Sequence, residues 1–359
     1  KAKSLHKQLE NYLGKNKVED TMVNLNTKSV CPVCLKVIDA VYEEQTIIEE
    51  QEQWSGIFLN KSCKEHGFFS ALVWEDSMEA FVELLEQEPK GQRTLYGKKK
   101  QEKGCPYDCG LCEEHLQESC CVLLEVTNRC NLNCPVCFAS SESDGNNELS
   151  IAEIQESLLD MIQTGGPFNL QLSGGEPTVR EDLAQIIRLA KKYGFQYIQL
   201  NTNGLRIAME EGYLASLKEA GLDSVFLQFD GLNETSYQQL RGRKLLDLKK
   251  QVIQTCQEVQ MGVVLVCTLT PNVNLDQIGP LIEFAFEGLP VIRGVHFQPI
   301  SYFGRCLQDA PLHRITIPRV LREIEKQTKG LLKKEDFVNG KAEHGLCSFH
   351  GSFLKKQDG

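Results

Sequence analysis

The segment that organises this chain of 359 residues is Val122-Leu-Leu-Glu-Val126-Thr-Asn-Arg-Cys130-Asn-Leu-Asn-Cys134-Pro-Val-Cys137. Its short apolar run, which ends in a polar loop, predicts a buried β-strand. The loop carries cysteines at C-x-x-x-C-x-x-C spacing. Each iron of a cubane cluster takes one thiolate, so Cys130, Cys134 and Cys137 predict a 4Fe-4S cluster with one iron left open. Because an open iron can bind and reduce a further molecule, we expect these cysteines to be catalytic.

Composition limits the class of protein. An apolar content of 41% and a charged content of 25% are typical of a globular protein. The net charge of −10 argues against a nucleic-acid partner. No stretch reaches the roughly 20 apolar residues of a membrane span, and residues 1–7 lack the apolar core of a signal peptide. We therefore expect a cytoplasmic protein that is not an integral membrane protein and keeps its thiols reduced.

Repeated short apolar runs alternate with helical patterns from residue 121 onward, which predicts βα units and a parallel sheet. The expected strands are 121–126, 168–172, 196–200, 224–229, 262–269 and 293–298. Six units favour an open, partial barrel over the closed form with eight strands. The predicted fold class is therefore α/β, a partial (β/α)6 barrel with a small cysteine-rich, metal-binding N-terminal extension. The predicted domains are an extension at 1–104, an auxiliary cluster segment at 105–121, the barrel at 122–310 and a C-terminal tail at 311–359.

The N-terminal extension carries the ligand pattern of a mononuclear metal site. A C-x-x-C knuckle, an alternating segment and a C-x-x-H knuckle are the parts of a ribbon-type tetrahedral centre. We assign Cys31, Cys34, Cys63 and His66 to zinc, or to iron in a rubredoxin-like variant. The alternative is that these cysteines are buried apolar residues and His66 a surface histidine.

A further cysteine group lies just before the first strand of the barrel. Pro106 and Gly110 allow tight turns. An auxiliary 4Fe-4S cluster is predicted on Cys105, Cys109, Cys112 and Cys120. Such a saturated cluster would serve electron transfer, structure or substrate binding. A zinc knuckle is the alternative, since thiolates bind both metals.

Polar residues collect at the expected carboxyl ends of the strands, where active groups gather in parallel βα folds. The second strand runs into Gly174-Gly175-Glu176-Pro177, in which two glycines permit close backbone approach and Glu176 offers acceptors for an ammonium group. The third strand ends near Asn201 and Asn203, whose amides suit a ribose or a carboxylate or, alternatively, only close a turn.

The cysteine loop followed by Gly-Gly-Glu-Pro resembles the radical S-adenosylmethionine (radical SAM) superfamily. The resemblance implies that the open iron binds SAM and that its cleavage yields a 5′-deoxyadenosyl radical. It implies that Gly174 to Pro177 hold the SAM ammonium and that Asn201 and Asn203 contact SAM. The superfamily usually has an aromatic residue before the last cysteine, where this chain has Val136, so we expect Phe138 to line the adenine pocket.

The same resemblance suggests further cofactor contacts. Gln228 and Arg241 are expected around the SAM carboxylate, for which the two-pronged guanidinium is suited. Gln298, near the end of the sixth strand, is expected beside the adenine or the substrate.

The order of cysteine motifs along the chain looks like that of the tetraether lipid synthase group and its radical SAM relatives, although only Cys347 follows the barrel here. We therefore expect an iron–sulfur transferase or oxidoreductase that couples or alkylates a hydrophobic, lipid-like substrate. Its electrons would come from a reductase or from a flavodoxin or ferredoxin. The alternatives are a peptide maturase or heterocycle methyltransferase and, in another class, an iron–sulfur electron carrier or redox sensor.

Overall fold

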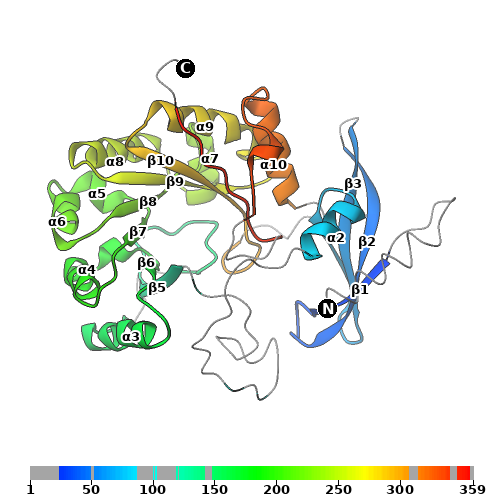
Figure 1. Ribbon diagram of the computed structural model, residues 1–359, viewed down its shortest axis with the longest axis horizontal. Helices are drawn as coiled ribbons and strands as arrows, with labels where there is room; N and C mark the ends of the chain where they lie inside the picture. The colour runs from blue at the N-terminus through cyan, green and yellow to red at the C-terminus, as the bar shows by residue number, and fades with distance from the viewer. Residues whose placement is uncertain are drawn as a thin grey trace. The chain divides into compact units, whose positions relative to one another are not determined.

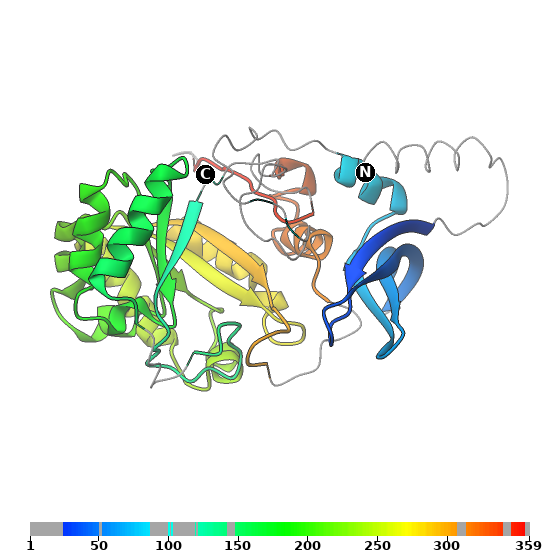
Figure 2. The same ribbon diagram turned by 90° about the horizontal axis from the view of Figure 1, so that it is seen from below.

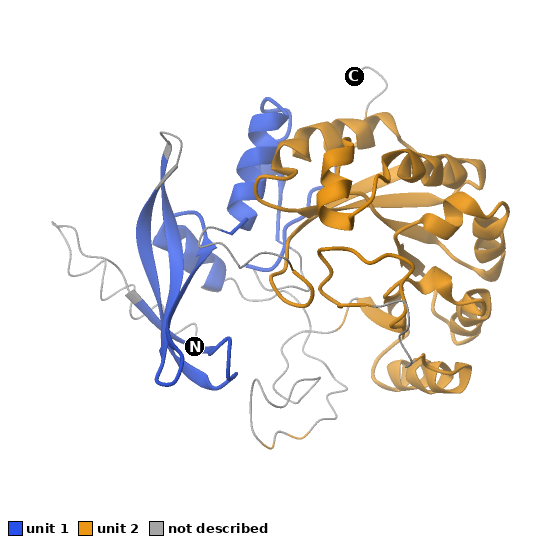
Figure 3. Cartoon of the chain, turned by 180° about the vertical axis from the view of Figure 1, so that it is seen from behind, with its two compact units in different colours: residues 1–90, 310–353 blue, residues 91–309, 354–359 orange. Residues whose placement is uncertain are grey.

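The structure is a computed structural model that describes residues 24–49, 52–86, 121–141, 148–306, 314–339 and 346–355, together with Lys100, Glu102 and Ser119. The chain divides into two compact units (Figure 3). Unit 1 comprises residues 1–90 and 310–353, and unit 2 comprises residues 91–309 and 354–359.

Unit 1 is built on an antiparallel sheet in the order β1-β2-β3-β4. Its elements are β1 (Asn24–Val30), β2 (Val37–Glu49), β3 (Glu52–Cys63), β4 (Gly67–Trp74), α2 (Met78–Glu86), α10 (Ile317–Gln327) and the 3-10 turn η3 (Lys334–Asp336). Side chains alternate along the strands, and α2 covers one face of the sheet with Phe81 and Val82. The resulting core is small and fully buried at Ile57 and Phe81. Ile47, Phe58 and Leu72 form a second, smaller buried cluster.

The C-terminal segment belongs to this same core. Ile317 and Leu346 pack against the buried cluster around Phe81. Glu75, at the end of β4, is buried and accepts hydrogen bonds from Arg322 Nη2 at 2.7 Å and Thr316 Oγ1 at 3.1 Å. The segment that the sequence analysis set apart as a tail is therefore part of the ribbon unit.

Unit 2 contains a parallel sheet in the order β10-β9-β8-β7-β6-β5. Its strands are β5 (Cys121–Thr127), β6 (Asn169–Gly174), β7 (Ile198–Thr202), β8 (Ser224–Gln228), β9 (Gly262–Leu269) and β10 (Ile292–Pro299). Each strand pairs in parallel with the next along the chain, as the sequence predicts for successive βα units. The partial barrel with a cysteine-rich N-terminal extension is thus confirmed.

Helices cover the convex face of this curved sheet (Figures 1 and 2). Those of unit 2 are α3 (Ile151–Gln163), α4 (Leu183–Lys192), α5 (Leu205–Met209), α6 (Tyr213–Ala220), α7 (Glu234–Arg241), α8 (Leu246–Glu258) and α9 (Ile278–Glu287), with 3-10 turns η1 (Pro177–Val179) and η2 (Leu275–Gln277). Leu170, Leu172 and Val225 are fully buried beneath this layer. Gln171, Ser173 and Phe226 alternate with them and point to the opposite face. We call that opposite face the inner face.

None of the helices in the described ranges combines the length and the apolar character needed to cross a bilayer.

The attachment of the C-terminal segment can be tested at Glu75. Glu75→Ala removes the acceptor for Arg322 and Thr316, and we expect the free energy of unfolding of unit 1 to fall by about 1 to 2 kcal/mol. Glu75→Gln keeps an acceptor of the same shape and should lose less than half as much. Both tryptophans of the chain, Trp54 and Trp74, lie in unit 1, so tryptophan fluorescence during urea unfolding reports this unit. Equal losses in the two variants would contradict the assigned contact.

Candidate functional site

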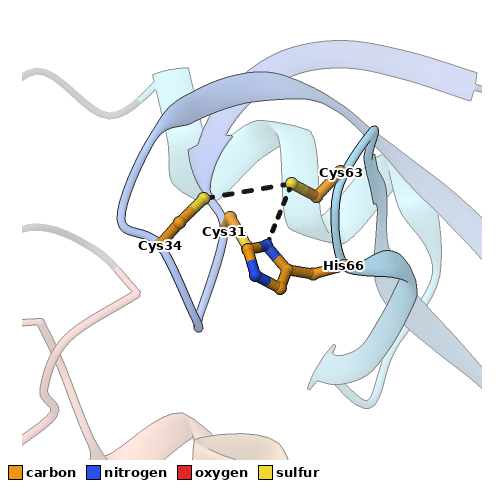
Figure 4. Close-up of side chains that lie close together, drawn as sticks. All are labelled: Cys31, Cys34, Cys63 and His66. Carbon is orange, nitrogen blue, oxygen red and sulfur yellow. Dashed lines mark hydrogen bonds between the residues drawn. The ribbon is translucent and has the colours of Figure 1, made fainter.

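The four predicted ligands of unit 1 come together at one end of its sheet (Figure 4). Their ligand atoms all lie within 4.8 Å of one another. The Cys34 and Cys63 sulfur atoms are 3.9 Å apart, and His66 Nδ1 is 3.5 Å from Cys63 Sγ and 3.6 Å from Cys31 Sγ. Four ligands around Zn²⁺, with Zn–S bonds of about 2.3 Å, place their sulfurs about 3.8 Å apart. The donor set therefore fits a tetrahedral metal ion.

Local hydrogen bonds order Cys31 and favour the thiolate form of Cys63. The pKa of Cys34 is raised, because a hydrogen bond from the Lys36 backbone is outweighed by burial and by the neighbouring thiols. The Val33 N–H donates to Cys31 Sγ at 3.4 Å, and the Leu35 N–H donates to the Cys31 carbonyl at 3.0 Å. Hydrogen bonds from the Glu65 backbone and then from the His66 ring lower the pKa of Cys63 to about 6. The thiolate is the form that binds metal, so this knuckle is ready to coordinate at neutral pH.

In unit 2, the three cysteines lie in the loop after β5 and are half-buried. Burial is the main cause that raises the pKa of Cys130 to about 11, with added effects from Glu176 and the other two thiols. Burial also raises the pKa of Cys134, although Arg241 acts against it. The three thiols thus share one partly dehydrated region. Three soft donors on one loop suit an iron–sulfur cluster.

Arg305, which follows β10, holds this loop in place. The backbones of Cys137 and Arg305 exchange two hydrogen bonds of 2.8 Å, and Arg305 Nε donates to the Cys134 carbonyl at 2.7 Å. A side chain at Gly304 would place its Cβ 2.2 Å from the Phe138 carbonyl oxygen, so only glycine permits this approach. No local sequence pattern predicts this contact, because the two segments lie 171 positions apart.

The Gly174-Gly175 pair lets β6 approach the cysteine loop. The Gly175 N–H donates to the Thr127 carbonyl and the Glu176 N–H to the Arg129 carbonyl, both at 2.8 Å. A Cβ on Gly174 would lie 2.1 Å from the Thr127 oxygen, and one on Gly175 would lie 2.3 Å from the Arg129 oxygen. The close approach expected of these glycines is made here to the backbone of the loop.

Glu176 is 1% exposed and joins the ends of β6 and β7. Its Oε1 accepts from the Thr178 N–H at 3.1 Å, Thr178 Oγ1 at 2.6 Å and Thr202 Oγ1 at 2.7 Å, and its Oε2 accepts from the Asn203 N–H at 2.6 Å. Asn203 Nδ2 in turn donates to Asn131 Oδ1 in the cysteine loop at 2.8 Å. Four protein donors thus engage the carboxylate, and its predicted contact with the SAM ammonium stays a prediction.

Arg241 and Gln228 meet around a buried carboxylate. Asp230 is fully buried and forms a two-pronged ion pair with Arg241, with distances of 2.7 and 2.8 Å. Arg241 also donates to the Val136 carbonyl in the cysteine loop at 3.3 Å. Gln228 donates to the same carboxylate. Arg241 therefore ties the loop to the end of β8, and its expected contact with the SAM carboxylate remains a prediction.

Lys249, on α8, is a site residue that the sequence analysis missed. It is fully buried, and its Nζ donates to the Asn203 carbonyl at 2.5 Å and to Gln228 Oε1 at 3.0 Å. A signal was present, because Lys249 occupies the buried stripe of its helix with Leu246, Val252 and Cys256. Burial lowers its pKa to about 7, although Asp230 acts against this.

The remaining predicted residues lie at the same end of the sheet or outside the described ranges. Phe138 is 55% exposed and packs edge-on against Phe303, with ring centroids 6.3 Å apart. Pro177 is buried in η1, and Gln298 pairs with Thr268 across β10 and β9. The predicted auxiliary ligands Cys105, Cys109, Cys112 and Cys120 fall outside the described residues.

Comparison with known proteins identifies the family. The family model described as the radical SAM superfamily matches residues 124–285, which include the cysteine loop and the glycine pair. The chain belongs to the radical SAM superfamily. This radical SAM chain also matches, over residues 24–75, the model described as the HMPTM N-terminal zinc ribbon domain, which covers the four ligands of unit 1.

Two relatives carry informative names. A 7,8-dihydro-6-hydroxymethylpterin dimethyltransferase of Methanocaldococcus jannaschii is 42% identical over 315 residues, which are 87% of this radical SAM chain and 60% of that protein. A probable GTP 3′,8-cyclase of Methanothermobacter thermautotrophicus is 34% identical over 171 residues, or 47% of this chain and 55% of that protein. The chain thus spans less than two thirds of either relative.

A solved structure, SuiB of Streptococcus suis bound to the precursor peptide SuiA, is 18% identical with a TM-score of 0.48 and covers 58% of this chain and 45% of that one.

The metal site of unit 1 can be tested by elemental analysis. We expect about one tightly bound zinc or mononuclear iron per chain, as in other sites with three Cys and one His. Cys34→Ala should lose most of this metal, whereas Cys256→Ala, which removes a buried thiol of unit 2, should keep it. Retention of the metal in Cys34→Ala would contradict the site.

Lys249 predicts a pH dependence of stability. Between its folded pKa of about 7 and its ordinary value of 10.5, the unfolded chain holds a proton that the folded chain has lost. The free energy of unfolding therefore rises with pH in this window, by up to about 1.4 kcal/mol per unit. In urea titrations of the apoprotein, the free energy of unfolding of the wild type should rise between pH 7 and pH 9 by about 2 kcal/mol more than that of Lys249→Met. The neighbouring exposed Lys250→Met should follow wild type, and parallel curves for all three proteins would refute the assignment.

Proposed function

We propose that this chain carries the activity of a radical SAM methyltransferase whose substrate is a flat nitrogen heterocycle of the pterin class. The relative that matches 87% of the chain is named for methylation of a dihydropterin. A second relative is named for a cyclase of GTP. Pterin and guanine both contain a 2-amino-4-oxopyrimidine ring, so the two named substrates share one hydrogen-bonding edge.

The observation that carries the proposal is the polarity of the inner face. Amide and hydroxyl side chains occupy it on four of the strands, namely Gln171, Ser173, Gln199, Asn201, Ser224 and Gln298. Most of these groups hydrogen-bond to one another, but an acyl chain would leave the buried Asn201 Oδ1, which accepts no hydrogen bond from any described residue, without a partner at a cost of about 1 to 3 kcal/mol. A heterocycle with several N–H and C=O groups supplies the missing donor and matches the polarity of the face. We therefore favour the heterocycle, which was the alternative in the sequence analysis, over the lipid-like substrate that the sequence analysis expected.

Cys130, Cys134 and Cys137 would hold the reactive 4Fe-4S cluster, whose chemistry with SAM is the supply of a 5′-deoxyadenosyl radical that takes hydrogen from a C–H bond. The residues of this chain contribute by holding the cysteine loop and the adjacent strand ends in fixed positions. Arg305 and Arg241 fix the backbone of the cysteine loop, and Glu176 fixes the adjacent ends of β6 and β7. Such prior ordering lowers the cost of bringing reactants together. The auxiliary cluster and the flavodoxin, ferredoxin or reductase donor remain part of the proposal.

Turnover tests the proposal. Anaerobically reconstituted protein, given excess SAM, dithionite and 7,8-dihydro-6-hydroxymethylpterin, should form 5′-deoxyadenosine and a pterin with methyl groups in place of hydrogen. A second SAM supplies each methyl group and leaves as S-adenosylhomocysteine, and dithionite supplies the electrons. Cys134→Ala should form neither product, because the cluster loses a ligand. Chromatography with mass detection measures both products.

The outcomes separate the competing functions. No 5′-deoxyadenosine above the Cys134→Ala background would refute the enzyme and favour an electron carrier or redox sensor. 5′-Deoxyadenosine without any change to the pterin would refute the substrate class.

A further inference from the structure

A chain of hydrogen bonds crosses the inner face from β8 to β6. Gln199 Nε2 donates to Ser224 Oγ at 3.0 Å, and Gln171 Nε2 donates to Gln199 Oε1. Asn201 Nδ2 donates to Gln171 Oε1 at 3.5 Å and to Ser173 Oγ at 3.4 Å. The amides of Gln171 and Gln199 are thus engaged within the protein, and the chain ends at Asn201.

The Asn201 side chain has a buried oxygen, Oδ1, that accepts no hydrogen bond from any residue within the described ranges. Burial of an unpaired acceptor costs about 1 to 3 kcal/mol, so such atoms are uncommon unless a ligand or water uses them. The amide nitrogen of the same group is held by two acceptors, which fixes the direction of the oxygen. Asn201 Oδ1 is therefore an oriented acceptor that awaits an N–H donor.

Phe226 and Glu125 add groups on the inner face that suit a flat nitrogen heterocycle. Phe226 pairs with Asn201 in the sheet, and its ring lies 5.3 Å from the His296 ring. Glu125 pairs with Ser173 and is exposed. In the described part of the chain, no side chain forms an ion pair with Glu125. Around Asn201 the inner face thus offers the Phe226 ring and two acceptors, Asn201 Oδ1 and the charged Glu125 carboxylate.

We infer that Asn201, Glu125 and Phe226 bind the aminopyrimidinone half of the substrate. Asn201 Oδ1 and the Glu125 carboxylate accept hydrogen bonds from the ring N–H and the 2-amino group, and the Phe226 ring packs on the ring plane. The inference rests on the proposed function, which supplies the substrate class. It gives Asn201 a role toward the substrate, in place of the SAM contact expected from the sequence.

The position of Asn201 along its strand supports this role. Asn203, two residues further on, is the residue that reaches the cysteine loop through Asn131. Two strand residues span about 6.6 Å. Asn201 therefore lies deeper on the inner face than the residue that contacts the loop.

Binding measurements test the inference independently of turnover. Reconstituted protein with SAM bound is titrated calorimetrically with 7,8-dihydro-6-hydroxymethylpterin and with the corresponding lumazine, in which oxygen replaces the 2-amino group. Asn201→Leu and Glu125→Gln should each weaken pterin binding by about tenfold or more, the usual loss for a hydrogen bond to a fixed or charged acceptor. Glu125→Gln should not weaken lumazine binding and should strengthen it, because the 2-oxo group of the lumazine is an acceptor that the introduced amide, but not the carboxylate, can meet with a donor. Glu156→Gln, an exposed change on α3, should match wild type.

The outcomes are distinguishable. Wild type that does not bind the pterin overturns the proposed function and this inference with it. Wild type that binds, with both variants equal to it, overturns the inference alone. A loss of SAM affinity in Asn201→Leu, measured by a separate calorimetric titration of the reconstituted protein with SAM, also overturns it, since Asn201 would then serve the cofactor. If Asn201→Leu does not fold, the exposed Glu125→Gln and its pterin-to-lumazine comparison decide.

Discussion

The three-cysteine loop has no regular secondary structure, so its backbone polar groups must find partners elsewhere in unit 2. Arg305 meets the Cys134 carbonyl and pairs with the Cys137 backbone, while Arg241 meets the Val136 carbonyl. On the other side, Gly175 and Glu176 donate to the carbonyls of Thr127 and Arg129. The thiols thus owe their positions to the ends of strands β6, β8 and β10, and a change at any of those strand ends would displace the three thiols.

Buried charges connect these supports. The Asp230 carboxylate accepts hydrogen bonds from Arg241 and Gln228. Lys249 donates both to Gln228 Oε1 and to the Asn203 carbonyl. Asn203 leads to Glu176 through its N–H and to the cysteine loop through its amide. In a region of low dielectric, removal of one charged member leaves its partners unpaired at a high cost. The network therefore fixes the geometry around the loop as a unit.

The sequence predicted those features that depend on local patterns. The six strands and the cysteine motifs of both units follow from apolar runs and from ligand spacing, which neighbouring residues set. Features that depend on distant contacts were missed. Arg305 meets a loop 171 positions away, and Arg322 meets Glu75 over 247 positions. The spacing of apolar residues along the chain does not predict contacts between such distant residues. Lys249 is an intermediate case. Its place in the apolar stripe of a helix was visible in the sequence, but its hydrogen-bond partners on other elements were not.

Unit 1 is discontinuous along the chain, since its ribbon comes from residues before 91 and its sealing helix α10 from residues after 309. A ribosome makes the polypeptide from its N-terminus, so the metal knuckles emerge more than 200 residues before Ile317 and Leu346, which pack on the ribbon core. The nascent ribbon must therefore wait, with part of its apolar surface open to solvent, until the whole barrel has been translated. Coordination of a metal ion during that interval would be the strongest restraint keeping the incomplete domain folded.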